Sequence, residues 1–146
     1  MATHRRVDFT ISVRAGPDRV YDALTTAKGL DAWFTKGATV EAVAGGSIWF
    51  RWENWGSHAY SGENGGLVLE ARRPNRFAFR WKVDSGAYET TVEINLEQRG
   101  EETLVRVVEY GFEESPVGMK DLLNRASGWG HVLTLLKFYV EHGLRG

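Results

Sequence analysis

The sequence predicts an α+β fold: a curved antiparallel β-sheet of about six to seven strands wrapped around a long C-terminal α-helix, with two short helices after the first strand. Several short segments alternate apolar and polar residues, which is the period of a half-buried strand. Short turns separate these segments and indicate antiparallel neighbours. The last segment instead repeats its apolar residues at helical spacing. A sheet with one apolar face and a helix with one apolar stripe are expected to bury each other.

The first part of the chain predicts one strand and two short helices. Residues 7–13 place an apolar side chain at every second position, as in a strand with one buried face. Pro17 suits the first turn of a helix, and Asp18 favours the positive end of the helix dipole. Residues 28–37 predict the second helix, with glycines near both ends and its large apolar residues on one side.

The middle of the chain predicts strands joined by turns. Gly45 and Gly46 mark a tight turn between two strands, and residues 72–76 and 99–102 mark two more. The glycine-rich segment 61–66 predicts a flexible hairpin loop. It lacks the lysine and the serine or threonine of a phosphate-binding loop, so no nucleotide site is expected there.

Aromatic residues are concentrated on the faces of the predicted strands. Read with a period of two, Phe50 and Trp52 share one face of their strand, and Phe79 and Trp81 share one face of theirs. Trp49 falls on the opposite face, where either neighbouring side chains cover it or it contacts a second copy of the chain. The inward rings have two interpretations: they fill an ordinary core, or they line a pocket.

The last segment predicts a helix of about twenty residues, or ~30 Å, which is long enough to cross a sheet. Its apolar stripe is Met119, Leu122, Ala126, Trp129, Leu133, Leu136 and Val140. Gly143 is expected to cap the end of the helix. Gly128 and Gly130 indicate either a close approach to the two N-terminal helices, which is the favoured account, or room for a ligand beside the indole of Trp129.

The composition favours a globular domain and excludes several classes of protein. The 146 residues fit one domain over 1–146, and the formal net charge of -1 provides no positive field to attract nucleic acid. There is no cysteine, no apolar run long enough for membrane insertion and no signal-peptide pattern, so we expect a cytoplasmic protein. The histidines form no i, i+4 pair, and neither a metal site nor a cofactor is expected.

Five segments together resemble a known family. They are PDRVYDALTTAKGLDAWF, GGSIWFRW, LVLEARRPNRFAFRW, TLVRVVEYGF and GWGHVLTLLKFYVE. In this order they are similar to the START-like helix-grip superfamily, also called SRPBCC, and within it to the branch of the activator of heat-shock-protein ATPase. The resemblance covers nearly the whole chain and implies a sheet that grips the C-terminal helix with a cavity between them. Members bind sterols, lipids, polyketides or plant hormones, some are cyclases or hydrolases, and others act through protein contacts.

The resemblance gives these aromatic residues and one carboxylate an expected place. The ligand-binding residues that it implies are Trp33, Phe50, Trp52, Phe79, Trp81, Glu109, Trp129 and Leu133. Glu109 follows Val105 and Val107 onto the inner face of its strand, where a carboxylate needs a cation or hydrogen-bond donors. In one interpretation Glu109 is a polar anchor or a general acid/base at the cavity mouth, which makes it the candidate catalytic residue. In the other it is a structural carboxylate. The structural alternative pairs it with Arg51, Arg80, a tyrosine or backbone amides.

Three functions follow as hypotheses. The first is binding of a small apolar or aromatic molecule between sheet and helix, with Arg51 or Tyr60 supplying polarity beside Glu109. The second is a cyclase- or hydrolase-type enzyme, which requires Glu109 to face an open cavity. The third is a protein-interaction module with a chaperone partner, as in the activator. A homodimer is a further alternative for the assembly.

Overall fold

In the computed structural model of the chain, seven antiparallel strands form one sheet in the order β1-β7-β6-β5-β4-β3-β2. The structure describes residues 5–143. The strands are β1 (Arg6–Val13), β2 (Thr39–Val40), β3 (Ser47–Trp55), β4 (Tyr60–Arg72), β5 (Arg76–Lys82), β6 (Glu89–Arg99) and β7 (Glu102–Tyr110). The helices are α1 (Pro17–Thr25), α2 (Ala27–Trp33) and α3 (Pro116–His142). The predicted fold class is confirmed, including the two short helices after the first strand.

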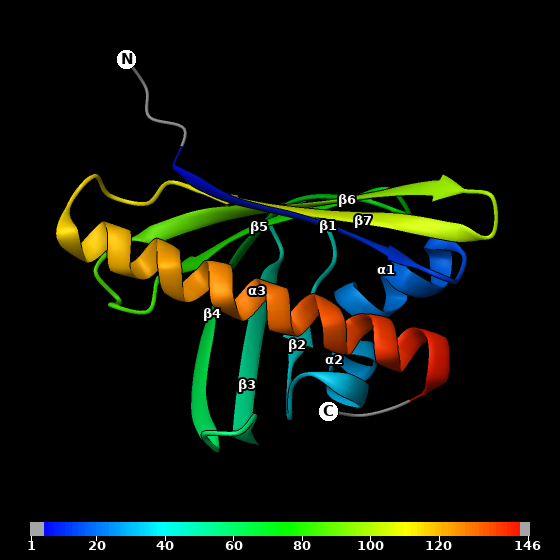
Figure 1. The fold of residues 1–146 in the computed structure, drawn as a ribbon, viewed down its shortest axis with the longest axis horizontal. Coiled ribbons are helices and arrows are strands. Elements are labelled where there is room, and N and C mark those ends of the chain that lie inside the picture. Colours follow the sequence, from blue (N-terminus) through cyan, green and yellow to red (C-terminus); the bar gives the residue numbers. More distant parts are fainter. Residues whose placement is uncertain (1–4, 144–146) are drawn as a thin grey trace.

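The sheet curves around α3. Figure 1 shows α3 crossing one face of the sheet, with α1 and α2 beside its C-terminal half, while β3 and β4 bend away from the remaining strands. The pairing register shifts between Trp52 and Trp55 in β3 and between Val68 and Glu70 in β4. Such bulges bend a strand and increase its local twist, so they account for the concave face that the sheet turns toward α3.

The core lies between this concave face and the C-terminal half of α3. The buried residues of α3 there include Leu133, Leu136 and Val140, and they oppose buried strand residues such as Val92 and Val107. Each such apolar side chain stabilises the fold by roughly 1.5–3 kcal/mol on burial. None of the three described helices has the length and apolar content to cross a bilayer.

The N-terminal half of α3 differs from its prediction. The helix has 27 residues rather than about twenty, and Met119 is 36% exposed while Leu122 and Ala126 are only partly buried. The residues that face the interior in these turns are Asp121 and Arg125. The predicted apolar stripe is therefore fully buried only in the C-terminal half. In the first turns Leu122 and Ala126 pack against the edge of the core, Met119 is exposed, and Asp121 and Arg125 face polar partners of the sheet and of the β5–β6 connection.

The end of α3 is fixed by a glycine cap and by one carboxylate. Gly143 has a left-handed φ of 71°, and its N–H donates to the carbonyl oxygen of Tyr139 at 2.7 Å, which confirms the predicted cap. Two residues earlier, Glu141 accepts hydrogen bonds from Lys137 Nζ and from the backbone N–H of Arg14, both at 2.7 Å. Glu141 therefore joins the helix end to the residue that follows β1.

We expect Glu141→Gln to lower the free energy of unfolding at neutral pH by about 0.5–1.5 kcal/mol. The hydrogen bond from Lys137, followed by that from the Arg14 amide, lowers the pKa of Glu141. Because the pKa is lowered in the folded state, this contribution is complete at neutral pH and is lost as the pH falls through the lowered pKa. Urea unfolding of wild type and variant should converge in acid, and a difference that is constant with pH would contradict this assignment.

The flexible loop predicted over 61–66 is wrong, because these residues lie within β4. A Cβ atom at Gly65 would overlap the Trp49 side chain, and one at Gly66 would overlap the backbone of β5. The glycines thus permit the close approach of neighbouring strands rather than loop flexibility. Residues 56–59 form the actual connection between β3 and β4.

Trp49 lies on the outer face of β3, as the period of two predicts. Its indole is partly covered by the Gly65 backbone, and its Nε1 donates to Glu63 Oε1 at 2.7 Å. The residue is still 44% exposed, so neighbouring side chains cover only part of the ring.

Candidate functional site

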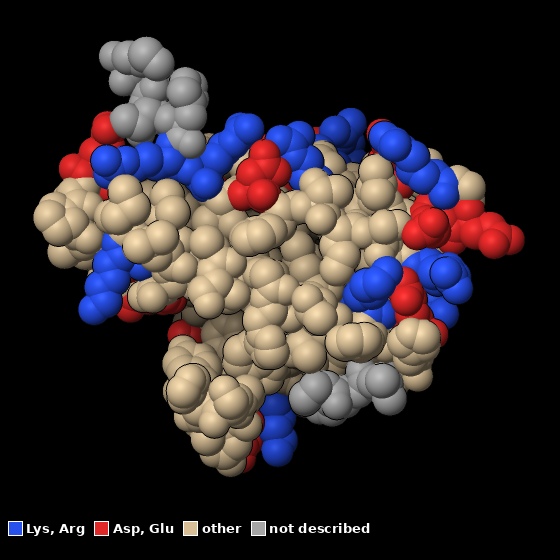
Figure 2. All heavy atoms as spheres, viewed as in Figure 1, with Lys and Arg blue, Asp and Glu red and all other residues tan. Residues whose placement is uncertain are grey.

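A pocket of about 470 Å³ lies between α3, the β3–β4 hairpin and the β5–β6 connection. Figure 2 shows it as a recess between the protruding tip of that hairpin and the helix. Its lining residues are Phe34, Trp52, Trp55, Tyr60, Glu63, Asn64, Trp81, Lys82, Val83, Asp84, Gly86, Asn124, Arg125, Gly128, Trp129 and Val132.

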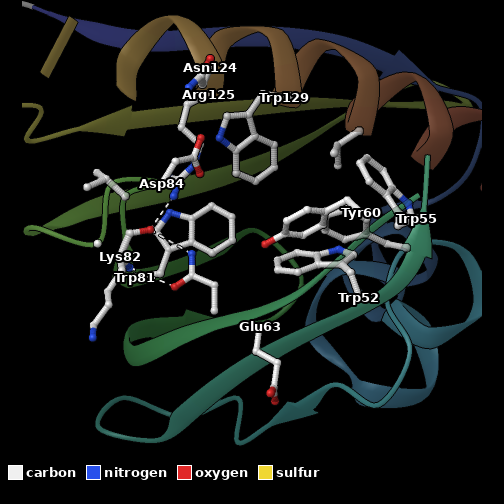
Figure 3. Close-up of a pocket in the computed structure, with 16 residues that line it drawn as sticks. Trp52, Trp55, Tyr60, Glu63, Trp81, Lys82, Asp84, Asn124, Arg125 and Trp129 are labelled. Carbon is white, nitrogen blue, oxygen red and sulfur yellow. Dashed lines mark hydrogen bonds and ion pairs between the residues drawn. The ribbon is translucent and has the colours of Figure 1, made fainter. Parts of the chain in front are cut away.

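Aromatic rings form most of the apolar wall of this pocket (Figure 3). On the strand side, the Trp52 ring lies 5.8 Å from that of Tyr60 and 5.5 Å from that of Phe34, measured between centroids. At the other end of the pocket, the ring of Trp81 in β5 lies 6.0 Å from that of Trp129 in α3. Rings at these separations interact favourably with one another and present a broad apolar surface to the space between them.

Two of these indoles are held from behind by a buried carboxylate. Glu109 has no exposed surface. Its Oε1 accepts a hydrogen bond from Trp129 Nε1 at 2.8 Å, and its Oε2 accepts from Trp81 Nε1 at 3.0 Å and from Thr90 Oγ1 at 2.5 Å. Arg125 also donates to Oε2 and balances the charge. This donor set satisfies a buried carboxylate and fixes both indoles edge-on to it.

Arg125 reaches Glu109 from α3 and makes further contacts on the way. Its Nη2 donates to the carbonyl oxygen of Lys82 at 2.5 Å, and its Nε lies 3.6 Å from Asp84 Oδ1. The centre of its guanidinium lies 4.4 Å from the centroid of the Trp81 ring, within the range of a cation–π interaction. The positive charge is therefore buried with several partners on the sheet side of the helix.

The structure divides the predicted ligand-binding residues into two groups. Those that line the pocket are Trp52, Trp81 and Trp129. Those that are buried and do not line it are Trp33, Phe50, Phe79, Glu109 and Leu133. In the second group, the Phe50 ring stacks on Trp52 at 5.8 Å between centroids and the Trp33 ring stacks on Phe34 at 5.1 Å, so both support the wall from behind.

The predicted structural pairing of Glu109 with Arg51 or Arg80 is wrong. Arg51 is exposed and donates from Nη1 to the carbonyl oxygen of Lys36 at 3.0 Å. Arg80 is also exposed, on the opposite face of β5 from the buried residues beside it. Side chains alternate along a strand, so both arginines point away from the carboxylate, and the helix residue Arg125 takes their place.

Sequence reasoning missed two important residues of the site. Arg125 lies beside the helical stripe, one turn before Trp129, and a single cation at that spacing is the available signal. Trp55 was assigned no place in the pocket. It lines the pocket together with Trp52 because the bulge between them, with Asn54 at φ 51°, breaks the alternation of β3.

Gly128 borders the pocket, and its backbone leaves open space where a Cβ atom would lie. At Gly130, the nearest atom to that position is in the Phe9 ring of β1, at 3.9 Å. The favoured account of these glycines, a close approach to the two N-terminal helices, is therefore wrong. Gly128 instead leaves room beside Trp129.

The comparison with protein families is decisive for classification. The family model described as "Activator of Hsp90 ATPase homolog 1-like protein" matches residues 14–141. The chain belongs to this family. No curated protein matches the chain.

Solved structures similar to this family member share its fold at low sequence identity. The Aha1 dimer from Colwellia psychrerythraea is 24% identical, with a TM-score of 0.75, and the match covers 94% of this chain and 97% of that one. Protein SSP2350 from Staphylococcus saprophyticus is 23% identical, with a TM-score of 0.78 and coverages of 97% and 95%. DynU16, from the dynemicin biosynthetic locus, is 21% identical, with a TM-score of 0.79 and coverages of 97% and 49%.

The β5–β6 connection, which forms one rim of the pocket in this family member, is attached to α3 by Asp121. The buried carboxylate accepts hydrogen bonds from the backbone N–H and the hydroxyl of Ser85, at 3.2 and 3.1 Å, and from the Tyr88 hydroxyl at 3.1 Å. Burial raises the pKa of Tyr88, which keeps its hydroxyl protonated as a donor. Within residues 5–143, no three histidine or carboxylate side chains are grouped as metal ligands.

We expect Asp121→Ala to lower the free energy of unfolding by about 1–3 kcal/mol, since it leaves buried donors without an acceptor. Hydrogen exchange should locate the change, with faster exchange of the Ser85 amide. Asn124→Ala, at an exposed position on the same helix, is the matched control and should leave that amide unchanged. Equal protection of Ser85 in all three proteins would show that Asp121 does not hold the rim.

Proposed function

We propose that this family member binds a small apolar or aromatic molecule in the pocket between the sheet and α3. The observation that carries the proposal is the pocket itself: about 470 Å³, with six aromatic rings forming most of its apolar wall and six charged or amide residues completing its lining. Ligand sites commonly have this size and combine apolar walls with polar groups. The structural similarity to DynU16 of the dynemicin biosynthetic locus is consistent with a small-molecule role.

Glu109 acts in this proposal as a positioning residue and not as a general acid/base. Its oxygens are directed at Trp81, Trp129, Thr90 and Arg125, and it does not line the pocket. An acid/base must come within hydrogen-bond distance of the reacting group. A carboxylate behind the two indoles instead fixes the shape of the wall before a ligand arrives, which reduces the ordering that binding requires.

A thermal-unfolding screen with purified protein tests the proposal. The compounds are sterols, apolar acids and neutral aromatic molecules, each at several concentrations. A compound present at 100 times its dissociation constant should stabilise the protein by ~2.7 kcal/mol. Calorimetric titration of the best compound should then give a stoichiometry of one per chain. If no class of compound stabilises the protein, the binding function is overturned.

Contact with a chaperone is the second candidate function, and the family match is the observation that favours it. The test is the ATPase rate of a purified Hsp90-class chaperone with and without an excess of this protein. Stimulation that is unaffected by filling the pocket would support a role exerted through the protein surface. An unchanged rate, together with no complex in sedimentation, would exclude this role for the chaperone tested.

A further inference from the structure

The rings of the pocket suit a cation as well as an apolar molecule. Four of the six aromatic residues in its lining are tryptophans, namely Trp52, Trp55, Trp81 and Trp129. The face of an indole carries negative charge density and attracts a cation placed over it more strongly than other aromatic side chains do. Arg125 already uses this attraction, because the centre of its guanidinium lies 4.4 Å from the centroid of the Trp81 ring. The pocket wall thus holds one cation of the protein itself on an aromatic face.

The charged groups at one end of the pocket leave an excess of negative charge. Arg125 has two carboxylate partners: it donates to the buried Glu109, and its Nε lies 3.6 Å from Asp84 Oδ1. Two carboxylates against one guanidinium leave one net negative charge. The Asp84 side chain is 52% exposed and lines the pocket, so its charge acts on the space that a ligand would occupy. Figure 3 shows Asp84 beside Arg125, at the end of the pocket that contains Trp81 and Trp129.

The other charged residues of the lining do not offset this charge. Glu63 accepts a hydrogen bond from Trp49 on the outer face of the sheet, so its carboxylate is directed away from the interior. Lys82 meets Arg125 through its backbone carbonyl, and its side chain extends away from the labelled aromatic residues in Figure 3. Within residues 5–143, the lining contains no further arginine, lysine or histidine. A positively charged ligand therefore meets no unpaired cation in this pocket.

We propose that the ligand is an organic cation, with an apolar or aromatic body and a quaternary or protonated amine. The amine lies among the rings at the Asp84 end of the pocket, and the body fills the remaining apolar space. The proposal rests on the proposed binding function and specifies its ligand class. An anion of the same shape would meet Asp84 and would find the guanidinium of Arg125 already engaged.

Three probes share a phenol body and differ in the charge of a tetrahedral head group. They are 3-hydroxyphenyltrimethylammonium, which is a cation, 3-tert-butylphenol, which is its neutral carbon analogue, and 3-hydroxybenzenesulfonate, which is an anion. Titration of the wild-type protein at pH 7 and low salt should rank the ammonium about tenfold tighter than the neutral analogue. The sulfonate should bind more weakly than both.

Asp84→Asn removes the charge of the carboxylate and keeps its shape. In this variant the preference for the ammonium over 3-tert-butylphenol should fall by about threefold, because water partly screens a half-exposed charge. Glu63→Gln is the matched control, since it removes a carboxylate that contacts Trp49 on the outer face of the sheet. The preference should be unchanged in the control.

Tyr60→Leu tests the aromatic part of the proposal. Tyr60 lines the pocket and is 49% exposed, so its replacement leaves the core in place. Its hydroxyl points across the pocket toward Trp81 in Figure 3, which places the ring on the path between the two ends of the pocket. Loss of the ring should lower the preference for the ammonium by about threefold or more. Tyr60→Phe, the matched control, keeps the ring and should keep the preference.

The outcomes distinguish this inference from the function on which it rests. Equal binding of the ammonium and 3-tert-butylphenol by the wild-type protein overturns the cationic ligand class but leaves the pocket as a ligand site. Tighter binding of the sulfonate than of the ammonium overturns it as well. An unchanged preference in both Asp84→Asn and Tyr60→Leu overturns the placement of the cation. If none of the three probes binds, the cationic class falls, and the binding function itself falls only if the thermal screen also fails.

Discussion

Glu109→Gln is expected to lower the free energy of unfolding by about 3–5 kcal/mol. The substitution leaves the buried Arg125 with only the half-exposed Asp84 as a counter-ion and directs an amide group at side chains that all donate hydrogen bonds. Removal of one member of a buried ion pair destabilises a protein far more than removal of both, because the remaining buried charge is poorly solvated. Glu109 should therefore be one of the most sensitive positions of the protein.

Two further variants make this prediction specific, with urea unfolding as the measurement. Glu93→Gln, on the outer face of β6, removes a partly exposed partner of Arg76 at 3.4 Å and should change stability by no more than about 1 kcal/mol. Arg125→Met combined with Glu109→Gln removes the unpaired charge and should recover part of the loss. A loss below about 1 kcal/mol in Glu109→Gln alone would show that the carboxylate does not hold the two indoles.

Gly128→Phe is expected to weaken ligand binding by about tenfold or more while the protein stays folded. The Gly128 backbone faces open space in the pocket, so a phenylalanine ring occupies the volume that a ligand would need. Replacement of glycine inside a helix also removes a conformational cost of up to about 1 kcal/mol, which favours folding of the variant. The measurement is the affinity for the best compound of the thermal screen.

Ser127→Phe provides the matched control for this prediction. It places the same side chain one residue earlier in α3, at an exposed position outside the pocket lining. Its affinity for the ligand should equal that of the wild type. If both variants bind normally, the ligand occupies another site, and if both lose binding, the effect belongs to the helix surface rather than to the pocket.

The parts of the fold that follow from local periodicity could be predicted from the sequence. The alternation along β7 places Val105, Val107 and Glu109 on one buried face, and the structure shows all three buried. The cap at Gly143 follows from its residue type and its place after the last apolar turn. These features depend on neighbours in the chain, which sequence patterns describe well.

The features that were not predicted depend on contacts between distant segments. The glycines of β4 resemble a loop until Trp49 and the backbone of β5 are seen against them. Arg125 resembles an ordinary helix-surface cation until the curved sheet brings Glu109 to it from 16 residues away. Trp55 joins the pocket only because a bulge reverses its direction. No local pattern contains that information.

The most direct test of a ligand in this pocket uses the indole protons as position markers in an NMR titration with the compound that stabilises the protein most in the thermal screen. Four tryptophans line the pocket, namely Trp52, Trp55, Trp81 and Trp129. Trp33 does not line the pocket but stacks on Phe34, which does, and Trp49 lies on the outer face of β3. We predict saturable shifts that are largest at the four pocket indoles, with Trp49 unchanged. Shifts largest at Trp49, or no shifts at saturating probe, would contradict a ligand site between the sheet and α3.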